Sequence, residues 1–467
     1  MVTAVISIAS DVGAGKGCGF MRAMSSWAVV QSVLGKRSSA WPPLERSRVA
    51  DEEGKLFSRL WLATGAANLG DGIARLALPL LVLGQGGSAT SVAAVALAGR
   101  APWLIGSLPA GLIVDRLDRR RLAIGANLSR VVLLGAVALF ASAGSVTVPL
   151  VLAVTFLIGL AEVLADSATQ AMIPTVVPQG DLTVANQRLI GTETVANEFS
   201  GPALGGVVSV IGGAVAFGSS AGLFLIAAGV LLSMRGRFVA NPTHSRSVAN
   251  ANLPRRAEGR WVGDVFEGWR FIRATPVLRG LVLSVLGMSL AWSAHQAVLV
   301  VYLVAPGPDG LSPGTFGFVL GGIGIGGLLG TLLVGRIVRL IGETWTIALD
   351  LVGCVGMVAV PLLTANPWWV AAATVGAGFG SGMWSVLVSA MRQRLTPPDL
   401  IGRVSSTYRL FSMGSMTLGA GGAVAIVAMG DVRIVFGVFT VVALLACVPY
   451  LVWVRPAMRN MSPSSSD

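Results

Sequence analysis

The residues that could do chemistry in this chain are ionisable side chains placed inside long apolar runs. In the first half of the chain these residues are Asp71, Arg75, Arg100, Arg130, Glu162, Asp166, Glu193 and Glu198. An ionised group near the centre of a bilayer costs about 2.5–3.5 kcal/mol on insertion scales. Such residues therefore indicate ion pairing, proton transfer or ligand binding within a membrane.

Two pairs of these residues have helical spacing. Asp71 lies four positions before Arg75, and Glu162 lies four before Asp166, so each pair shares one helix face. We expect Asp71 to alternate between an ion pair with Arg75 and a protonated state. Glu162 and Asp166 repel each other, which favours a proton on one of them. Asp71, Glu162 and Asp166 are therefore the predicted proton-coupling residues, with static ion pairing between helices as the alternative.

The second half of the chain has far fewer charges inside its apolar runs, among them Asp350, His295 and Arg409. We expect the first half to handle protons and the second to shape a substrate cavity. The predicted cavity residues are Arg75, Arg100, Glu193, Glu198, Trp292, His295, Trp384 and Arg409. For His295 and the tryptophans, simple packing between helices is the alternative.

Composition identifies the elements that must hold these residues. The 467 residues are 54% hydrophobic and 12% charged, with a mean hydropathy of +0.76, whereas soluble domains have about 25% charged residues. The sequence predicts an all-α polytopic membrane protein. Twelve apolar runs reach the length of about 20 residues that a spanning helix needs. They lie near 57–83, 89–113, 121–143, 147–171, 188–210, 213–234, 277–304, 313–335, 344–364, 367–391, 402–428 and 431–454.

Basic residues fix the predicted topology, because arginines collect in alternate loops when a protein follows the positive-inside rule. This accounts for the net charge of +12 without a nucleic-acid partner. Both termini are expected in the cytoplasm. The predicted parts are a disordered tail (1–54), a six-helix half (55–235), a cytoplasmic linker (236–276), a second six-helix half (277–455) and a tail (456–467).

The linker ends in a predicted amphipathic helix. Trp261, Val265, Trp269 and Ile272 recur on one helical face, and charged residues occupy other positions. We expect this helix to lie on the inner membrane surface. A site for a calmodulin-like partner is the alternative.

A short charged loop between the second and third runs contains Gly111, Asp115, Arg116, Arg119 and Arg120. Their spacing resembles the loop signature of the major facilitator superfamily, although Asp118 stands where that signature has a second glycine. A plain positive-inside loop is the alternative, but such a loop needs no aspartate directly after a span. The resemblance implies that these residues gate transport.

The fifth run contains Gly201-Pro202-Ala203-Leu204-Gly205-Gly206. It resembles the antiporter motif of major facilitator exporters, except that Asn197 replaces a glycine common in that family. Proline kinks a helix and glycine permits close helix contact. The resemblance implies a coupling role for Gly201, Pro202, Gly205 and Gly206, and a packing kink without a transport role is the alternative.

The resemblance covers about residues 55–455 and is close to the bacterial group that contains the enterobactin exporter and related multidrug efflux pumps. Gly70-Asp71-Gly72 and Gly402-Arg403-Val404 fit that group. It implies the major facilitator fold and a monomeric plasma-membrane antiporter that exports a drug, siderophore or similar metabolite in exchange for protons. The alternatives are an importer or uniporter and, from another class, a membrane-embedded enzyme or receptor. No cofactor is expected, and Cys18, Cys354 and Cys447 lack metal-ligand spacing.

Overall fold

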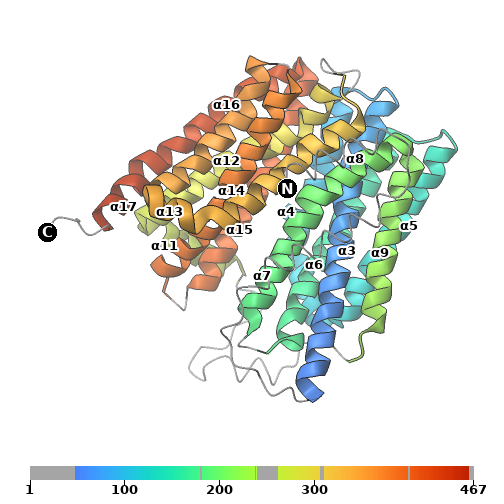
Figure 1. Ribbon diagram of the computed structural model, residues 1–467, viewed down its shortest axis with the longest axis horizontal. Helices are drawn as coiled ribbons and strands as arrows, with labels where there is room; N and C mark the ends of the chain where they lie inside the picture. The colour runs from blue at the N-terminus through green and yellow to red at the C-terminus, as the bar shows by residue number, and fades with distance from the viewer. Residues whose placement is uncertain are drawn as a thin grey trace. The chain divides into compact units, whose positions relative to one another are not determined.

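Long helices form almost all of the described chain (Figure 1). The computed structural model describes residues 48–178, 181–236, 238, 261–304, 310–364, 366–397 and 400–461. The predicted disordered segments therefore lie mostly outside the described residues. Residues Glu53–Asp467 form one compact unit, and the other unit, Met1–Glu52, contributes only the start of the first described helix.

The helices of the first half are α3 (Arg48–Gly84), α4 (Ala89–Arg116), α5 (Arg119–Ser142), α6 (Val148–Val176), α7 (Leu182–Glu193), the π-helix η2 (Thr194–Ser200), α8 (Gly201–Ile211) and α9 (Gly213–Ser233). Those of the second half are α12 (Pro276–Leu303), α13 (Pro313–Leu363), α14 (Pro367–Leu395), α15 (Ile401–Met429), α16 (Val432–Pro449), the π-helix η3 (Tyr450–Val454) and α17 (Arg455–Met461). The short helix α11 (Trp261–Ala274) precedes the second half.

The described helices account for the predicted membrane passes. Ten helical stretches are long and apolar enough to cross a membrane. One of them, α13, contains two passes, because Gly342 interrupts it with a φ of 81°, a conformation that favours glycine. A further pass runs through α7, η2 and α8, which are too short to qualify one by one. Together they give the twelve predicted helices, and the fold class is confirmed.

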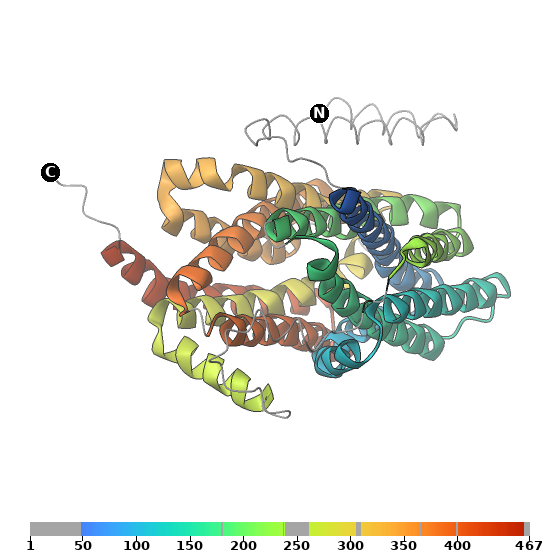
Figure 2. The ribbon, with the colours of Figure 1, turned by 90° about the horizontal axis from the view of Figure 1, so that it is seen from below.

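Helix α11 forms where the linker was predicted to be amphipathic (Figure 2). Part of its apolar face packs on α15. Ile272 is fully buried with Val404 of α15, and the Trp269 ring lies 5.1 Å from that of Phe411. Glu267 also pairs with Arg403 at 2.6 Å. Trp269 and Ile272 therefore face an apolar surface of α15, and the position of this helix at the inner membrane surface stays a prediction.

Candidate functional site

The most deeply buried charges form an ion pair between two helices of the first half. Arg130 of α5 donates from Nη1 to Oδ2 of Asp71 of α3 at 3.2 Å. Arg130 is 0% exposed and Asp71 is 5% exposed. The same nitrogen lies 3.5 Å from Oδ1 of Asn127, and the guanidinium lies over the Phe224 ring at 4.9 Å. Removing one partner of such a pair costs about 3–5 kcal/mol.

This inner pair is incompletely hydrogen-bonded. Within the described part of the chain, Oδ1 of Asp71 and both Nε and Nη2 of Arg130 have no hydrogen-bond partner. Buried polar atoms without partners are rare and often mark functional sites. The pair therefore depends on one good hydrogen bond and on charge.

One turn along α3, Arg75 binds two other carboxylates. Its Nη2 lies 3.1 Å from Oε1 of Glu162 on α6, and its Nη1 lies 3.7 Å from Oε1 of Glu198 on η2. The side chains of Arg75 and Glu198 are 37% and 42% exposed, whereas that of Glu162 is 12% exposed. This outer group of Arg75, Glu162 and Glu198 therefore reaches solvent through Arg75 and Glu198, unlike the inner pair.

The expected pair between Asp71 and Arg75 does not form. Although both residues occupy one face of α3, each takes a partner from a neighbouring helix: Arg130 of α5 for Asp71, and Glu162 of α6 for Arg75. Helical spacing alone could not show this, because the arrangement depends on which helices pack beside α3.

Further charges of the first half act on these pairs. Asp166 experiences the charges of Glu162, Arg130 and Asp71. Glu193, at the end of α7, experiences those of Glu162, Glu198, Arg75 and also Arg409 of the second half. The predicted residues Asp71, Arg75, Glu162, Asp166, Glu193 and Glu198 thus form one electrostatic cluster, which we call the carboxylate cluster.

Arg100 and Arg409 lie where the second half meets this cluster. Nη1 of Arg100 lies 3.6 Å from the sulfur of Met416, and the backbone carbonyl of Arg100 accepts a hydrogen bond from Thr417 at 3.2 Å. Both partners belong to α15. These contacts join α4 of the first half to α15 of the second.

The antiporter motif holds α3 close to the carboxylate cluster. A Cβ atom at Gly201 would lie 2.7 Å from Cα of Gly72 and 2.6 Å from the carbonyl oxygen of Ala196. A Cβ at Gly205 would lie 3.1 Å from Cα of Ile73. Only glycine allows this approach, and Gly72 is the immediate neighbour of Asp71. The motif therefore positions the inner pair.

The same motif also touches the second half. A Cβ at Gly206 would lie 3.0 Å from Cα of Gly317 on α13. A Cβ at Gly317 would in turn collide with the carbonyl oxygen of Pro202. The helix η2–α8 is thus held between α3 and α13. The π-helix η2 that precedes the motif carries Glu198 and Asn197, whose Nδ2 donates to Oδ1 of Asn68 at 3.4 Å.

The charged loop is anchored within the first half. Arg119 donates to the carbonyl of Ala171 at 2.8 Å, and Arg120 donates to those of Leu231 and Leu232 at 2.8 and 2.7 Å. Cations near the ends of α6 and α9 are favourable there. Arg116 is exposed, and a Cβ at Gly111 would meet open space. The side chain of Asp115 lies outside those described.

Asp118 explains the departure from the facilitator signature. Its side chain caps α5 by accepting from the backbone N–H of Arg121 at 3.0 Å, and it accepts from that of Phe238 at 3.3 Å. Its φ is −65°, so this position needs no glycine. Asp118 supplies an N-cap instead.

Three predicted cavity residues of the second half lie apart from the carboxylate cluster. His295 is 0% exposed, and its ring lies 5.6 Å from that of Phe436 in an apolar core. Trp292 packs against the same core. Trp384 is 7% exposed and donates to the hydroxyl of Tyr408 at 3.0 Å. For His295 the packing alternative fits this placement. Asn68 and Asn127 contact the site but were not predicted, because asparagines in a span lack the signal of a charge.

Comparison with known families agrees with this geometry. The sequence model of the transmembrane secretion effector family, a family of major facilitator transporters, matches residues 39–465. The chain belongs to this family. It is therefore a multi-pass membrane transporter and not an enzyme.

Curated relatives are efflux pumps and other transporters of this type. The multidrug efflux pump Tap of Mycolicibacterium fortuitum is 28% identical over 362 residues, which cover 76% of this chain and 84% of the pump. Tap of Mycobacterium tuberculosis is 29% identical over 277 residues, covering 58% of this chain and 62% of the pump. An uncharacterised facilitator-type transporter of Sinorhizobium fredii is 26% identical and covers 84% of this chain and 93% of its own length.

Solved structures share the fold at low identity. The nucleoside transporter NupG superposes with a TM-score of 0.64 at 14% identity, covering 86% of this chain and 98% of that chain. A bacterial homologue of the iron transporter ferroportin gives a TM-score of 0.62 at 17% identity, covering 88% of this chain and all of its own. These similarities confirm the major facilitator fold.

Proposed function

We propose that this transporter exports a small drug-like molecule from the cytoplasm in exchange for protons. In this proposal it works as a monomer in the plasma membrane with both termini in the cytoplasm, an orientation that the arginine-rich loops support. The two six-helix halves, 55–235 and 277–455, are the moving bodies. Similarity to the Tap pumps supports export as the direction.

The observation that carries proton coupling is the inner pair. Asp71 and Arg130 are buried together, yet Oδ1 of Asp71 and two nitrogens of Arg130 lack partners in the described part of the chain. A proton on Asp71 would remove its charge attraction to Arg130, at the cost of the single hydrogen bond between them. Arg130 would then be free to turn toward another carboxylate, such as Asp166, whose field it already shares.

The outer group offers a route for protons and cargo. Arg75 and Glu198 are open to solvent and Glu162 is nearly buried, and the distances of 3.1 Å from Arg75 to Glu162 and 3.7 Å to Glu198 allow Arg75 to exchange partners. In the carboxylate cluster, carboxyl groups outnumber guanidinium groups. This excess favours uptake of either a proton or a cationic cargo, which is the competition that antiport requires. We therefore propose a lipophilic cation as the preferred cargo, with Arg100, Arg409 and Glu193 lining its path.

The motif glycines would transmit the change. Asp71 adjoins Gly72, which packs on Gly201, and Gly206 packs on Gly317 of the second half. Protonation at α3 would thus act on the contact between η2–α8 and α13. Small shifts at closely packed contacts are converted into alternative packings of whole bodies.

Everted membrane vesicles containing this protein test the proposal. Acidifying their interior by respiration should drive accumulation of ethidium, and a protonophore should release the dye. Vesicles without the protein serve as the control. Accumulation that persists after the proton gradient collapses would contradict proton coupling, and no accumulation of any tested cation would contradict the proposed cargo.

A further inference from the structure

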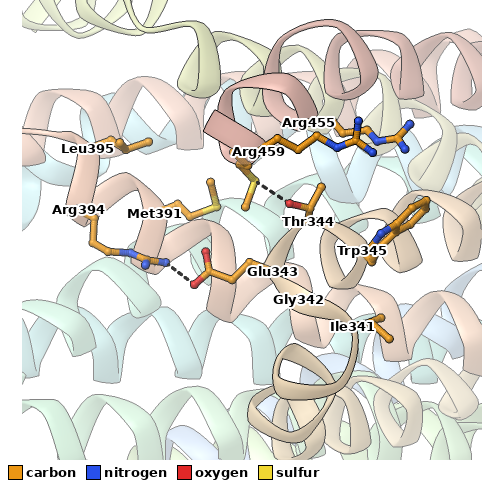
Figure 3. A pocket seen from close by; sticks show the side chains of 11 residues that line it. Ile341, Gly342, Glu343, Thr344, Trp345, Met391, Arg394, Leu395, Arg455 and Arg459 are labelled. Atoms are coloured by element: carbon orange, nitrogen blue, oxygen red, sulfur yellow. Dashed lines mark hydrogen bonds and ion pairs between the residues drawn. The ribbon is translucent and has the colours of Figure 1, made fainter. Parts of the chain in front are cut away.

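A cavity lies in the second half, remote in sequence from the carboxylate cluster. It has a volume of about 410 Å³ and lies among the break in α13 at Gly342, the end of α14 and the helix α17 (Figure 3). Neither the antiporter motif nor the charged loop contributes to its lining. The proposed transport mechanism does not use it.

Positive charge dominates this cavity. Arg394, Arg455 and Arg459 line it, whereas Glu343 is the one acidic residue in the lining. Glu343 is already engaged, since its Oε1 lies 3.0 Å from Nη2 of Arg394 (Figure 3). Arg455 and Arg459 therefore leave an excess of positive charge that suits an anion.

The cavity is held by specific contacts between elements. The hydroxyl of Tyr450 donates to the carbonyl of Thr344, which ties η3 to the second part of α13. The side chains of Met391 and Met458 belong to the apolar cluster beneath it. The second part of α13 begins at the cavity, and the start of a helix favours negative charge.

Ile341 and Trp345 form an exposed apolar part of the lining, and Leu340, which precedes Ile341 in the chain, extends this apolar surface beside the cavity. Leu340 is 82% exposed, Trp345 is 55% exposed and Ile341 is 41% exposed. The guanidinium of Arg455 lies over the Trp345 ring at 5.1 Å. Tryptophan and arginine are typical of the level where acyl chains meet headgroups, and apolar side chains there face the lipid tails.

We propose that this cavity binds the phosphate group of an anionic phospholipid. Arg455 and Arg459 contact the phosphate, since guanidinium groups bind phosphate oxygens in bidentate fashion. The acyl chains run over Leu340, Ile341 and Trp345. The exposed apolar side chains beside the arginines favour a lipid over a free phosphate ion. The bound lipid would hold α17 and α14 against the break in α13 at Gly342.

Thermal unfolding of the full-length protein in detergent tests this assignment. Phosphatidylglycerol should raise the unfolding midpoint more than phosphatidylcholine with the same acyl chains. Arg455→Gln and Arg459→Gln should each weaken the apparent affinity for phosphatidylglycerol about fivefold, the change expected for one basic residue near an anionic surface. Arg433→Gln should leave it unchanged, because Arg433 is exposed at the other end of the same α16–α17 segment.

Native mass spectrometry of the wild-type protein tests the proposal without any variant, because it counts the lipids that each protein molecule retains. Equal retention of both lipids would overturn the site. Inorganic phosphate that reproduces the shift, and loses it in Arg459→Gln, would overturn the lipid assignment in favour of a soluble anion. Arg455→Lys should restore part of the affinity that Arg455→Gln removes, and no difference between them would contradict recognition by charge.

Discussion

The two halves of this transporter stabilise their interiors by different means. In the first half, α3, α5 and α6 are linked by ion pairs through Asp71, Arg130, Arg75 and Glu162. In the second half, apolar side chains fill the buried interior, where Tyr302 and Phe436 pack edge to face at 5.2 Å and 77°.

The isolated polar groups of the second half underline the contrast. Asp350 is 3% exposed and has no ion pair within the described residues, and both ring nitrogens of His295 lack hydrogen-bond partners there. Charges arranged in exchangeable pairs can change partners, whereas isolated ones cannot. The comparison supports a division of roles. The first half moves protons, and the second half provides a rigid, packed surface on α13 that α8 contacts.

The largest expected effect is on stability at the inner pair. Arg130→Gln leaves Asp71 buried without its cation and should destabilise the protein by about 3–5 kcal/mol. Asp350→Asn should be neutral or stabilising, since no cation loses its partner. Thermal unfolding of both variants measures the difference. Equal destabilisation by the two changes would mean that the halves do not differ in this way.

The next effect concerns the contact between α8 and α3 within the first half. Gly201→Leu forces a side chain against Gly72 and the Ala196 carbonyl, and overpacking of this kind costs about 1–3 kcal/mol. Transport against a gradient should be lost. Gly218→Leu is the matched control, because a Cβ there meets nothing within 4 Å. Efflux from cells that express both variants at equal levels distinguishes them, and normal efflux by Gly201→Leu would leave the motif no coupling role.

These packing contacts mark the limit of what sequence could predict. The spans, the break near residue 342 and both motifs follow from apolar length and local spacing. The partners of Asp71 and Arg75 do not, because they lie on other helices. The position of α11 is a similar case: its amphipathic pattern is evident, but an apolar surface on α15 is indistinguishable in sequence from a membrane surface. Asp118 departs from the motif in sequence, and only its contacts with the backbone N–H groups of Arg121 and Phe238 explain the departure.

A smaller effect separates two aspartates of the charged loop. Asp118→Ala removes the N-cap of α5 and should cost about 1 kcal/mol of stability. Asp115→Asn should leave stability nearly unchanged but impair transport, as the facilitator signature implies. Unfolding midpoints and efflux rates, measured on both variants, test this separation. Unchanged efflux in Asp115→Asn would argue that the loop serves topology alone.

The smallest effect is expected at His295, in the apolar core of the second half. His295→Leu replaces two unpartnered ring nitrogens with apolar atoms of similar volume, so stability should be unchanged or slightly increased. The pH dependence of transport should also stay the same. A shifted pH profile in this variant would bring His295 into the proton pathway and weaken the contrast between the halves.

The central claim is that Asp71 carries the coupled proton, and a proteoliposome assay of Asp71→Asn tests it most directly. The amide preserves the shape of the side chain but cannot release a proton. Transport driven by a pH gradient should be abolished, whereas exchange of labelled for unlabelled substrate without a gradient should continue, because Arg75, Glu162 and Glu198 remain in place. Gradient-driven transport at the wild-type rate by Asp71→Asn would contradict the account.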